Sequence, residues 1–242
     1  MRVACRNRFI CPLRLESNMK VIALSGKMRS GKTTIALMLA KYLPNAYRVS
    51  FGDEVRREVA RGMGYQGDYQ RLFGINKNAL RPVLQAWGHN MRKIRGDDVW
   101  VKALFNRMIR MAMHDPNRTF IIDDVRYLNE AETIYNYDNE HILDYKAHTI
   151  RMICGRETQI RRGANPLYLE HSSETQLDLD AAFHFDSHFD SNDDDFHALF
   201  FDVLKELRIA GIINETQERK AWTRYLADSP EVPTKTLREY GA

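Results

Sequence analysis

Short apolar segments alternate with longer segments of helical periodicity along most of the chain. The apolar segments are typical of strands that a parallel sheet buries on both faces. Between them, apolar residues three and four positions apart indicate amphipathic helices. We expect strands over about residues 20–25, 47–51, 119–123 and 148–153, and an edge strand over 183–189. We expect helices over about residues 33–43, 54–62, 76–91, 99–113, 127–137 and 194–209. The alternation predicts an α/β protein with a central, mostly parallel sheet and helices on both faces.

The two ends of the chain lack this pattern. Residues 1–18 hold four arginines and one glutamate, so they carry +3 of the chain's net charge of +4. We expect a weakly ordered basic extension there, because no apolar core of a targeting peptide follows the arginines. Residues 212–242 are predicted to be a polar tail, in which Trp222, Tyr225 and Leu226 allow a short docked helix. One domain is therefore expected over residues 19–211.

Composition and charge argue against several classes of protein. Beyond residues 1–18 the chain of 242 residues is close to neutral, so no nucleic acid is expected as a partner. No apolar run reaches the ~18 residues of a membrane span, so no membrane is expected either. The three cysteines, Cys5, Cys11 and Cys154, have neither metal-site nor disulfide spacing, which suits a reducing compartment. We therefore expect a cytoplasmic protein.

A glycine-rich turn joins the first predicted strand to the first predicted helix. Its sequence from Gly26 to Thr33, GKMRSGKT, fits the phosphate-loop pattern GxxxxGK[ST] at every fixed position. In such a loop, backbone N–H groups and the helix N-terminus surround a phosphate. Gly26 and Gly31 permit the close approach, Lys32 would reach the β- and γ-phosphates, and the Thr33 hydroxyl would bind Mg²⁺. The sequence therefore predicts a three-layer P-loop NTPase fold that binds a nucleoside triphosphate.

Motifs of two large P-loop classes are missing. A GTPase reads guanine with [NT]KxD, but Asn76-Lys77 is followed by Asn78-Ala79, and no DxxG switch follows Asp123 and Asp124. A motor ATPase would end an apolar strand in Asp-Glu, whereas here the strand ends Ile-Ile-Asp-Asp. A kinase of a small acceptor is therefore the leading interpretation.

Arginines fall in turns and at element ends on the predicted nucleotide side of the sheet. They are Arg29, Arg56, Arg81, Arg126, Arg156, Arg161 and Arg162. If the acceptor is itself a phosphate, it is already anionic and needs no strong general base. It needs cations that hold two phosphate groups in line, and the planar fork of arginine binds two oxygens at once. Solvated surface arginine remains the alternative for any single member of this set.

Several segments together resemble the bacteriophage deoxynucleoside monophosphate kinases, within the P-loop nucleoside monophosphate kinase group. The similarity covers roughly residues 20–210. The segments that carry it are SGKMRSGKTT (25–34), FGDEVR (51–56), RPVLQAWG (81–88), DDVWV (97–101), DDVRYLNE (123–130) and HSSE (171–174). The resemblance implies ATP-dependent phosphorylation of deoxynucleoside monophosphates, with Mg²⁺ as cofactor. It further implies an acceptor-binding region over about 53–100 and a lid over about 155–170.

The resemblance also implies roles for single residues. The donor ATP would be held by Gly26, Lys27, Arg29, Ser30, Gly31, Lys32, Thr33, Thr34, Arg156 and Arg161. The acceptor would be held by Asp53, Arg56, Arg81, Gln85, Arg126 and Glu174. The catalytic residues would be Lys32, Arg126, Arg29 and Asp124. The metal would be bound by Thr33 and Asp124. A structural ion pair is the alternative for Asp124 and Arg126, and a surface position is the alternative for Gln85.

Other readings of the chain stay open. One is a different small-molecule P-loop kinase, acting on dephospho-coenzyme A or a nucleoside. Another is a P-loop ATPase associated with nucleic acid, and a homodimer is compatible with each. The alternating His184, Asp186, His188 and Asp190 would share one face of a strand, where we expect the solvent side of an edge strand rather than a metal site.

Overall fold

A computed structural model of the chain describes residues 15–75, 77–136, 143–166, 169, 175–178 and 183–229. Its strands are β1 Leu15–Gly26, β2 Ala46–Val49, β3 Thr119–Val125, β4 Leu143–Ile153 and β5 Ser187–Asp190. Its helices are α1 Lys32–Tyr42, α2 Phe51–Gly62, α3 Tyr69–Ile75, α4 Lys77–Arg95, α5 Val99–His114, α6 Leu128–Asn136, α7 Arg156–Arg161, α9 Phe196–Ile209 and α10 Glu215–Asp228. This confirms the predicted alternation of strands and helices.

The strands form a five-stranded sheet in the order β2-β3-β1-β4-β5, and each neighbouring pair is parallel. β1 is therefore the central strand, with β3 on one side and β4 on the other. All strands end at the same edge of the sheet, where ligands bind in open α/β folds. The loop after β1 thus lies in the middle of that edge.

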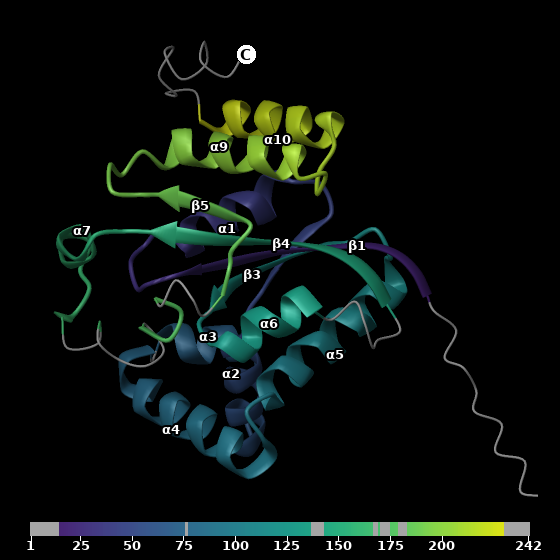
Figure 1. The fold of residues 1–242 in the computed structure, drawn as a ribbon. Coiled ribbons are helices and arrows are strands. Elements are labelled where there is room, and N and C mark those ends of the chain that lie inside the picture. Colours follow the sequence, from purple (N-terminus) through teal and green to yellow (C-terminus); the bar gives the residue numbers. More distant parts are fainter. Residues whose placement is uncertain are drawn as a thin grey trace, which may run out of the picture.

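Helices cover both faces of the sheet (Figure 1). Alternate residues of β1 point to opposite faces, as the pleat requires. Ile22 and Leu24 pack against α1, α9 and α10, whereas Val21 and Ala23 pack against the side of α5 and α6. The continuous apolar run that predicted this strand is therefore explained by two cores, one on each face.

α2, α3 and α4 build a smaller unit below the carboxyl edge of the sheet. It has its own apolar cluster, in which Val59, Ala60 and Phe73 are buried. α5 connects the cluster to the sheet through Trp100, whose indole N–H donates to the Gly88 carbonyl oxygen of α4 at 3.1 Å. α2 and α4 form the wall opposite the loop after β1.

Several boundaries differ from the sequence prediction. Residues 62–75 were expected to be a loop, but they contain α3, because Phe73 gains burial against α2 that local periodicity does not reveal. β1 begins at Leu15, inside the expected extension, because it pairs with β4 from Leu143 onward. Leu37 of α1 is apolar but 54% exposed. Pro82 lies inside α4.

Further differences concern helix caps and the edge strand. Asp98 directly precedes α5, but its side chain makes no capping hydrogen bond and pairs with Lys102 at 2.6 Å. β5 is an edge strand as predicted, although only Ser187–Asp190 is extended. His184, Asp186, His188 and Asp190 are all exposed. Among the described residues, no group of three or more His, Cys, Asp or Glu side chains could hold a metal ion.

The end of the chain adds a helix to the sheet. α10 was expected only as a short docked helix, and Tyr225 and Ala221 are buried against α1 and α9. Asn214 caps it with a reciprocal pair of hydrogen bonds to Gln217. Within the described ranges, none of the helices is both long and apolar enough to cross a lipid bilayer.

A buried histidine joins β4 to β5. His148 is 5% exposed, and its Nε2 lies 2.8 Å from the Ser187 hydroxyl, which donates to Glu206 at 2.8 Å. Burial lowers the pKa of His148, although Asp186 and Glu206 oppose the shift. The folded protein therefore holds the neutral imidazole, while the unfolded chain takes up a proton near pH 6.5.

We expect the free energy of unfolding to decrease as the pH falls below about 6.5, and His148→Gln to remove part of this decrease. The sign follows because the unfolded state binds more protons than the folded state in that range. Urea unfolding at several pH values, compared between wild type and His148→Gln, measures the difference. Identical pH dependence of the two proteins would contradict the assignment.

Candidate functional site

The loop after β1 has backbone angles that require glycine at two positions. Gly26 has φ +147° and Gly31 has φ +83°. An added Cβ at Gly26 would lie 2.6 Å from the carbonyl oxygen of Met152, and one at Gly31 would overlap the Phe196 ring. Arg29 also has a positive φ, 64°, so the chain turns sharply before α1. The two glycines of the motif are therefore explained by the local geometry.

Lys32 and Thr33 begin α1 at the inner side of this loop. Lys32 is only 6% exposed, and its ammonium group donates to the Lys27 carbonyl oxygen at 2.9 Å. The lysine charge is thus held inside the turn, next to the positive end of the helix dipole. Both features favour an anion at this position.

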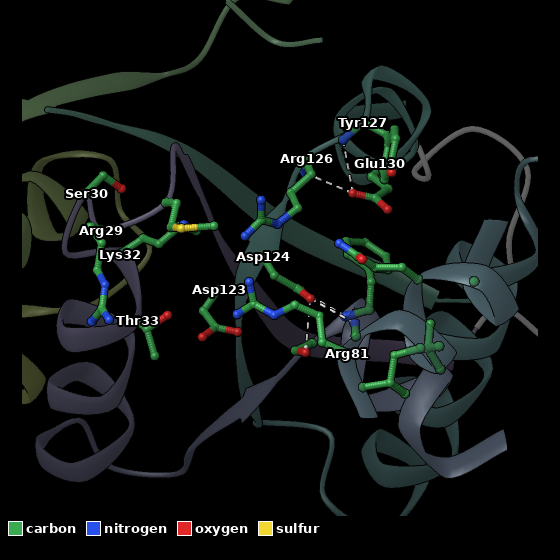
Figure 2. Close-up of a pocket in the computed structure, with 18 of the residues that line it drawn as sticks. Arg29, Ser30, Lys32, Thr33, Arg81, Asp123, Asp124, Arg126, Tyr127 and Glu130 are labelled. Atoms are coloured by element: carbon green, nitrogen blue, oxygen red, sulfur yellow. Dashed lines mark hydrogen bonds between the residues drawn. The ribbon is translucent and has the colours of Figure 1, made fainter. Parts of the chain in front are cut away.

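A cavity of about 1510 Å³ opens at the carboxyl ends of β1, β2 and β3. The loop side contributes Arg29, Lys32 and Thr33, and Figure 2 shows Arg81, Arg126 and Glu130 on the opposite side, with Asp123 and Asp124 between them. Single-ligand pockets usually measure about 300–1,000 Å³. The cavity is therefore large enough for two ligands, with cations at both ends.

Asp123 ends the continuous buried run of β3 and is 2% exposed. Its Oδ2 accepts a hydrogen bond from Arg48 Nε at 2.8 Å, whereas its buried Oδ1 has no hydrogen-bond partner within the described part of the chain. Burial, followed by the neighbouring Asp124, raises the pKa of Asp123, while Arg48 and the Thr33 hydroxyl oppose the shift. An orphaned carboxylate oxygen beside Thr33 is suited to a cation or a cation-bound water.

Asp124, unlike Asp123, has hydrogen-bond partners for both of its carboxylate oxygens. Its Oδ1 accepts the Phe51 N–H at 2.9 Å, and its Oδ2 accepts the Gly52 N–H at 2.8 Å and the Ser50 hydroxyl at 3.1 Å. Both oxygens thus satisfy donors at the N-terminus of α2. These contacts favour Asp124 as an anchor of α2, whereas the expected place of Asp124 at the metal stays a prediction.

Glu130 fixes the segment that carries Arg126. The Glu130 side chain is 1% exposed and accepts the backbone N–H groups of Arg126 at 2.9 Å and Tyr127 at 3.1 Å. Arg92 of α4 donates to its other oxygen at 3.0 Å and lies over the Tyr127 ring. Burial raises the pKa of Glu130 to about 7. Through Glu130 the end of β3 is tied to the opposite wall of the cavity.

The segment after β4 closes against the loop. Arg162 donates to the Arg29 carbonyl oxygen at 3.1 Å and to Asp194 at 2.6 Å. Arg161 reaches the second oxygen of Asp194 at 2.6 Å. The Arg162 hydrogen bond holds the pKa of Asp194 below its usual range. Arg162 therefore lies at the cavity in the position where the sequence analysis expected lid arginines.

The structure brings most of the predicted site residues to one cavity. Those that line it are Arg29, Ser30, Gly31, Lys32, Thr33, Thr34, Arg56, Arg81, Gln85, Asp124 and Arg126. Those that do not are Gly26, Lys27, Asp53, Arg156 and Arg161. Lys27 instead pairs with Asp178 at 2.6 Å, and Asp53 supports Arg56 at 2.6 Å. Glu174, and the segment HSSE that contains it, lie outside the described residues.

Several cavity residues had no role assigned from the sequence, among them Arg48, Arg92, Asp123 and Glu130. Arg48 stands one residue before the end of β2, but the strand was predicted over 47–51, so its place at the carboxyl edge of the sheet was not indicated. Arg92 and Glu130 are far apart in sequence, and their pairing depends on how α4 packs against α6. No periodicity could have indicated that pairing.

The protein groups present fit a magnesium ion that is held mainly by its nucleotide. Mg²⁺ keeps several waters and commonly binds proteins through one or two carboxylates together with substrate phosphates. Asp123, with its orphaned Oδ1, and the Thr33 hydroxyl offer such a limited protein contribution beside the loop.

Comparison with known proteins gives little further identification. No protein-family model matches the chain, and no curated protein matches its sequence. Among solved structures, the chain is similar to the tunicamycin resistance protein of Deinococcus radiodurans. The two share 15% sequence identity over 72% of this chain and 87% of that chain, with a TM-score of 0.42. At this level the likeness assigns neither a family nor an activity.

Proposed function

We propose that the protein is an ATP- and Mg²⁺-dependent kinase that phosphorylates deoxynucleoside monophosphates to diphosphates. The observation that carries the proposal is the single cavity with a phosphate-loop motif at one end and arginines at the other. A cavity of about 1510 Å³ offers space for a donor and an acceptor nucleotide together. The resemblance of the sequence segments to phage deoxynucleotide kinases adds the class of acceptor.

The donor would lie with its phosphates in the loop. Backbone N–H groups of the loop, the Lys32 ammonium and the dipole of α1 would stabilise the charge on the β- and γ-phosphates. Thr33 and Asp123 would hold a magnesium ion, which supplies further charge stabilisation when bound. Arg162, which already contacts the Arg29 carbonyl oxygen, would help to keep water from the γ-phosphate.

The acceptor would lie against the opposite wall. Arg56, Arg81 and Arg126 line the cavity there and would bind the monophosphate. One of its anionic oxygens attacks the γ-phosphorus, so a new O–P bond forms while the bond between the γ-phosphorus and its bridging oxygen breaks. ADP leaves with that oxygen. No proton has to be removed from an ionised acceptor phosphate, so the chain needs positioning and charge more than a base.

The proposal is tested by a panel of acceptors. Purified protein with ATP and Mg²⁺ is incubated with each deoxy- and ribonucleoside monophosphate, with dephospho-coenzyme A and with nucleosides, and ADP formation is measured. We expect ADP only with a subset of the deoxynucleoside monophosphates. Transfer to dephospho-coenzyme A or to a nucleoside alone would replace the proposed acceptor. Hydrolysis that requires DNA rather than a small acceptor would overturn the kinase assignment.

Arg126→Ala is expected to raise the acceptor KM about 10- to 100-fold and to leave the KM for ATP within about threefold. The reason is that a charge-assisted, desolvated contact to a phosphate contributes roughly 1.5–3 kcal/mol. Glu130 holds the backbone rather than the side chain of Arg126, so the strand end should keep its shape. Steady-state kinetics with each substrate varied separately provide the measurement. An unchanged acceptor KM would refute this placement of the acceptor phosphate.

A further inference from the structure

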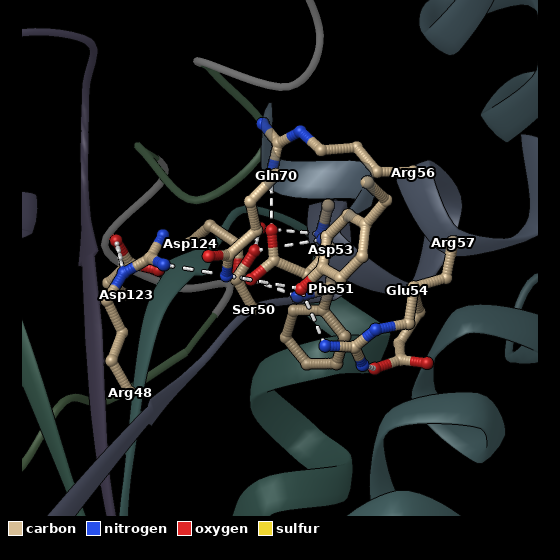
Figure 3. Close-up of polar contacts among 12 residues, drawn as sticks. Arg48, Ser50, Phe51, Asp53, Glu54, Arg56, Arg57, Gln70, Asp123 and Asp124 are labelled. Atoms are coloured by element: carbon tan, nitrogen blue, oxygen red, sulfur yellow. Dashed lines mark hydrogen bonds and ion pairs between the residues drawn. The ribbon is translucent and has the colours of Figure 1, made fainter. Parts of the chain in front are cut away.

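Arg48 lies between the two halves of the cavity. It stands one residue before the end of β2, and its side chain turns toward the end of β3 (Figure 3). Parallel pairing of β2 with β3 sets Arg48 opposite Ile121, two residues before Asp123. The guanidinium can therefore reach past the strand end to the carboxylates that line the site.

Two buried carboxylates share this guanidinium. Its Nε donates to Asp123 Oδ2 at 2.8 Å, and its Nη1 lies 3.6 Å from Asp53 Oδ2. The side chains of Asp123 and Asp53 are only 2% and 8% exposed, whereas that of Arg48 is 26% exposed. Arg48 is thus the most accessible of the three side chains, and it lines the cavity beside two buried carboxylates.

The charges around Arg48 are mostly negative. Burial disfavours its positive charge, but Asp123, Asp53 and Asp124 outweigh burial and raise the pKa of Arg48. Asp53 has a second cation, because Arg56 donates to its other oxygen at 2.6 Å. The hydrogen bonds of Asp124 come from Ser50 and the backbone of α2. Arg48 therefore provides the positive charge that balances Asp123.

We propose that Arg48 is the resident counter-ion of Asp123. In the metal-free protein, Arg48 provides at this carboxylate part of the positive charge that a divalent ion provides when it binds together with ATP. The proposal rests on the proposed function, since it takes the cavity to bind ATP. Asp123 Oδ1 is buried without a hydrogen-bond partner in the described part of the chain, while Oδ2 is held by Arg48. The two sources of charge therefore act on different oxygens of one carboxylate.

Electrostatics fixes the sign of the expected effect. A positive charge a few ångströms from the phosphates attracts ATP and repels a divalent ion at the same place. Removing the charge of Arg48 should weaken the binding of metal-free nucleotide and strengthen the contribution of the metal. Both changes increase one ratio, the dissociation constant of the nucleotide measured in EDTA divided by that measured in Mg²⁺.

The experiment measures this ratio with an unreactive ATP analogue, AMP-PNP, by calorimetry on the full chain. Arg48→Gln keeps a hydrogen-bond donor for Asp123 but removes the charge. Arg48→Lys keeps the positive charge but loses the planar set of guanidinium donors. Arg57→Met is the matched control, since Arg57 pairs with Glu54 at 2.8 Å on α2 and does not line the cavity. Thermal unfolding of each variant verifies that it is folded.

We expect the ratio to rise about tenfold or more in Arg48→Gln, which corresponds to one interaction between charges at an effective dielectric constant near 20 or above. Arg48→Lys and Arg57→Met should stay within about threefold of wild type. A ratio that is unchanged or lower in Arg48→Gln overturns the proposal, as does an equal rise in Arg57→Met or in Arg48→Lys. Absence of AMP-PNP binding by wild type in both buffers would instead refute the proposed function.

Discussion

Lys32→Met is expected to lower the rate of phosphoryl transfer by about 10²–10³-fold, the usual effect of removing one preorganised charge from a transition state. Lys32 is 6% exposed and its ammonium group rests on the Lys27 carbonyl oxygen inside the loop. In the proposed complex, a change of rotamer would bring this ammonium group to a phosphate held in the same turn. Methionine fills nearly the same volume but carries no charge. Phosphoryl transfer should therefore be lost while the loop keeps its conformation.

Two controls separate loss of chemistry from loss of structure. Thermal unfolding of Lys32→Met should occur at or above the wild-type temperature, because an ammonium group buried in the loop is replaced by an apolar chain. Lys41→Met removes the same charge from the other end of α1, where Lys41 pairs with Asp228 and its side chain is 59% exposed. It should keep turnover within about threefold. ADP formation near the wild-type rate in folded Lys32→Met would refute the role of the loop.

The sheet could be predicted from the sequence because its strands are buried on both faces. β3, for example, is apolar from Phe120 to Ile122, and this run is too short for a helix between the turn at 114–117 and Asp123. The loop could be predicted as well, because Gly26 and Gly31 meet geometric demands that no other residue satisfies. Structural features that are set within one short segment can therefore be predicted from the residues of that segment.

What could not be predicted depends on contacts between distant elements. α3 is short, and its burial comes from Phe73 packing under α2. Which of Asp123 and Asp124 anchors α2 could not be predicted for the same reason, because both carboxylates follow an apolar run and look alike in sequence. Only the position of the α2 N-terminus separates them, since it satisfies both oxygens of Asp124 and leaves Oδ1 of Asp123 without a hydrogen-bond partner in the described part of the chain.

Asp123→Asn is expected to reduce Mg²⁺-supported turnover about 10²-fold or more and to change stability little. An amide oxygen is a weaker magnesium ligand than a carboxylate, so the metal requirement should move to higher concentrations. Stability is expected to change little because burial already raises the pKa of Asp123 and so works against its charge. Turnover as a function of Mg²⁺ concentration, together with urea unfolding, measures both effects.

Asp124→Asn should show the opposite pattern. It removes a charge that accepts two backbone N–H groups and one hydroxyl at the start of α2, a loss of about 1–2 kcal/mol in the free energy of unfolding. Its Mg²⁺ requirement should stay near that of wild type, because neither oxygen is available to the metal in this arrangement. If instead Asp124→Asn shifts the Mg²⁺ requirement and Asp123→Asn does not, then Asp124 faces the metal as the resemblance to the phage kinases implies. The hydrogen bonds to α2 would in that case have to break when nucleotide binds.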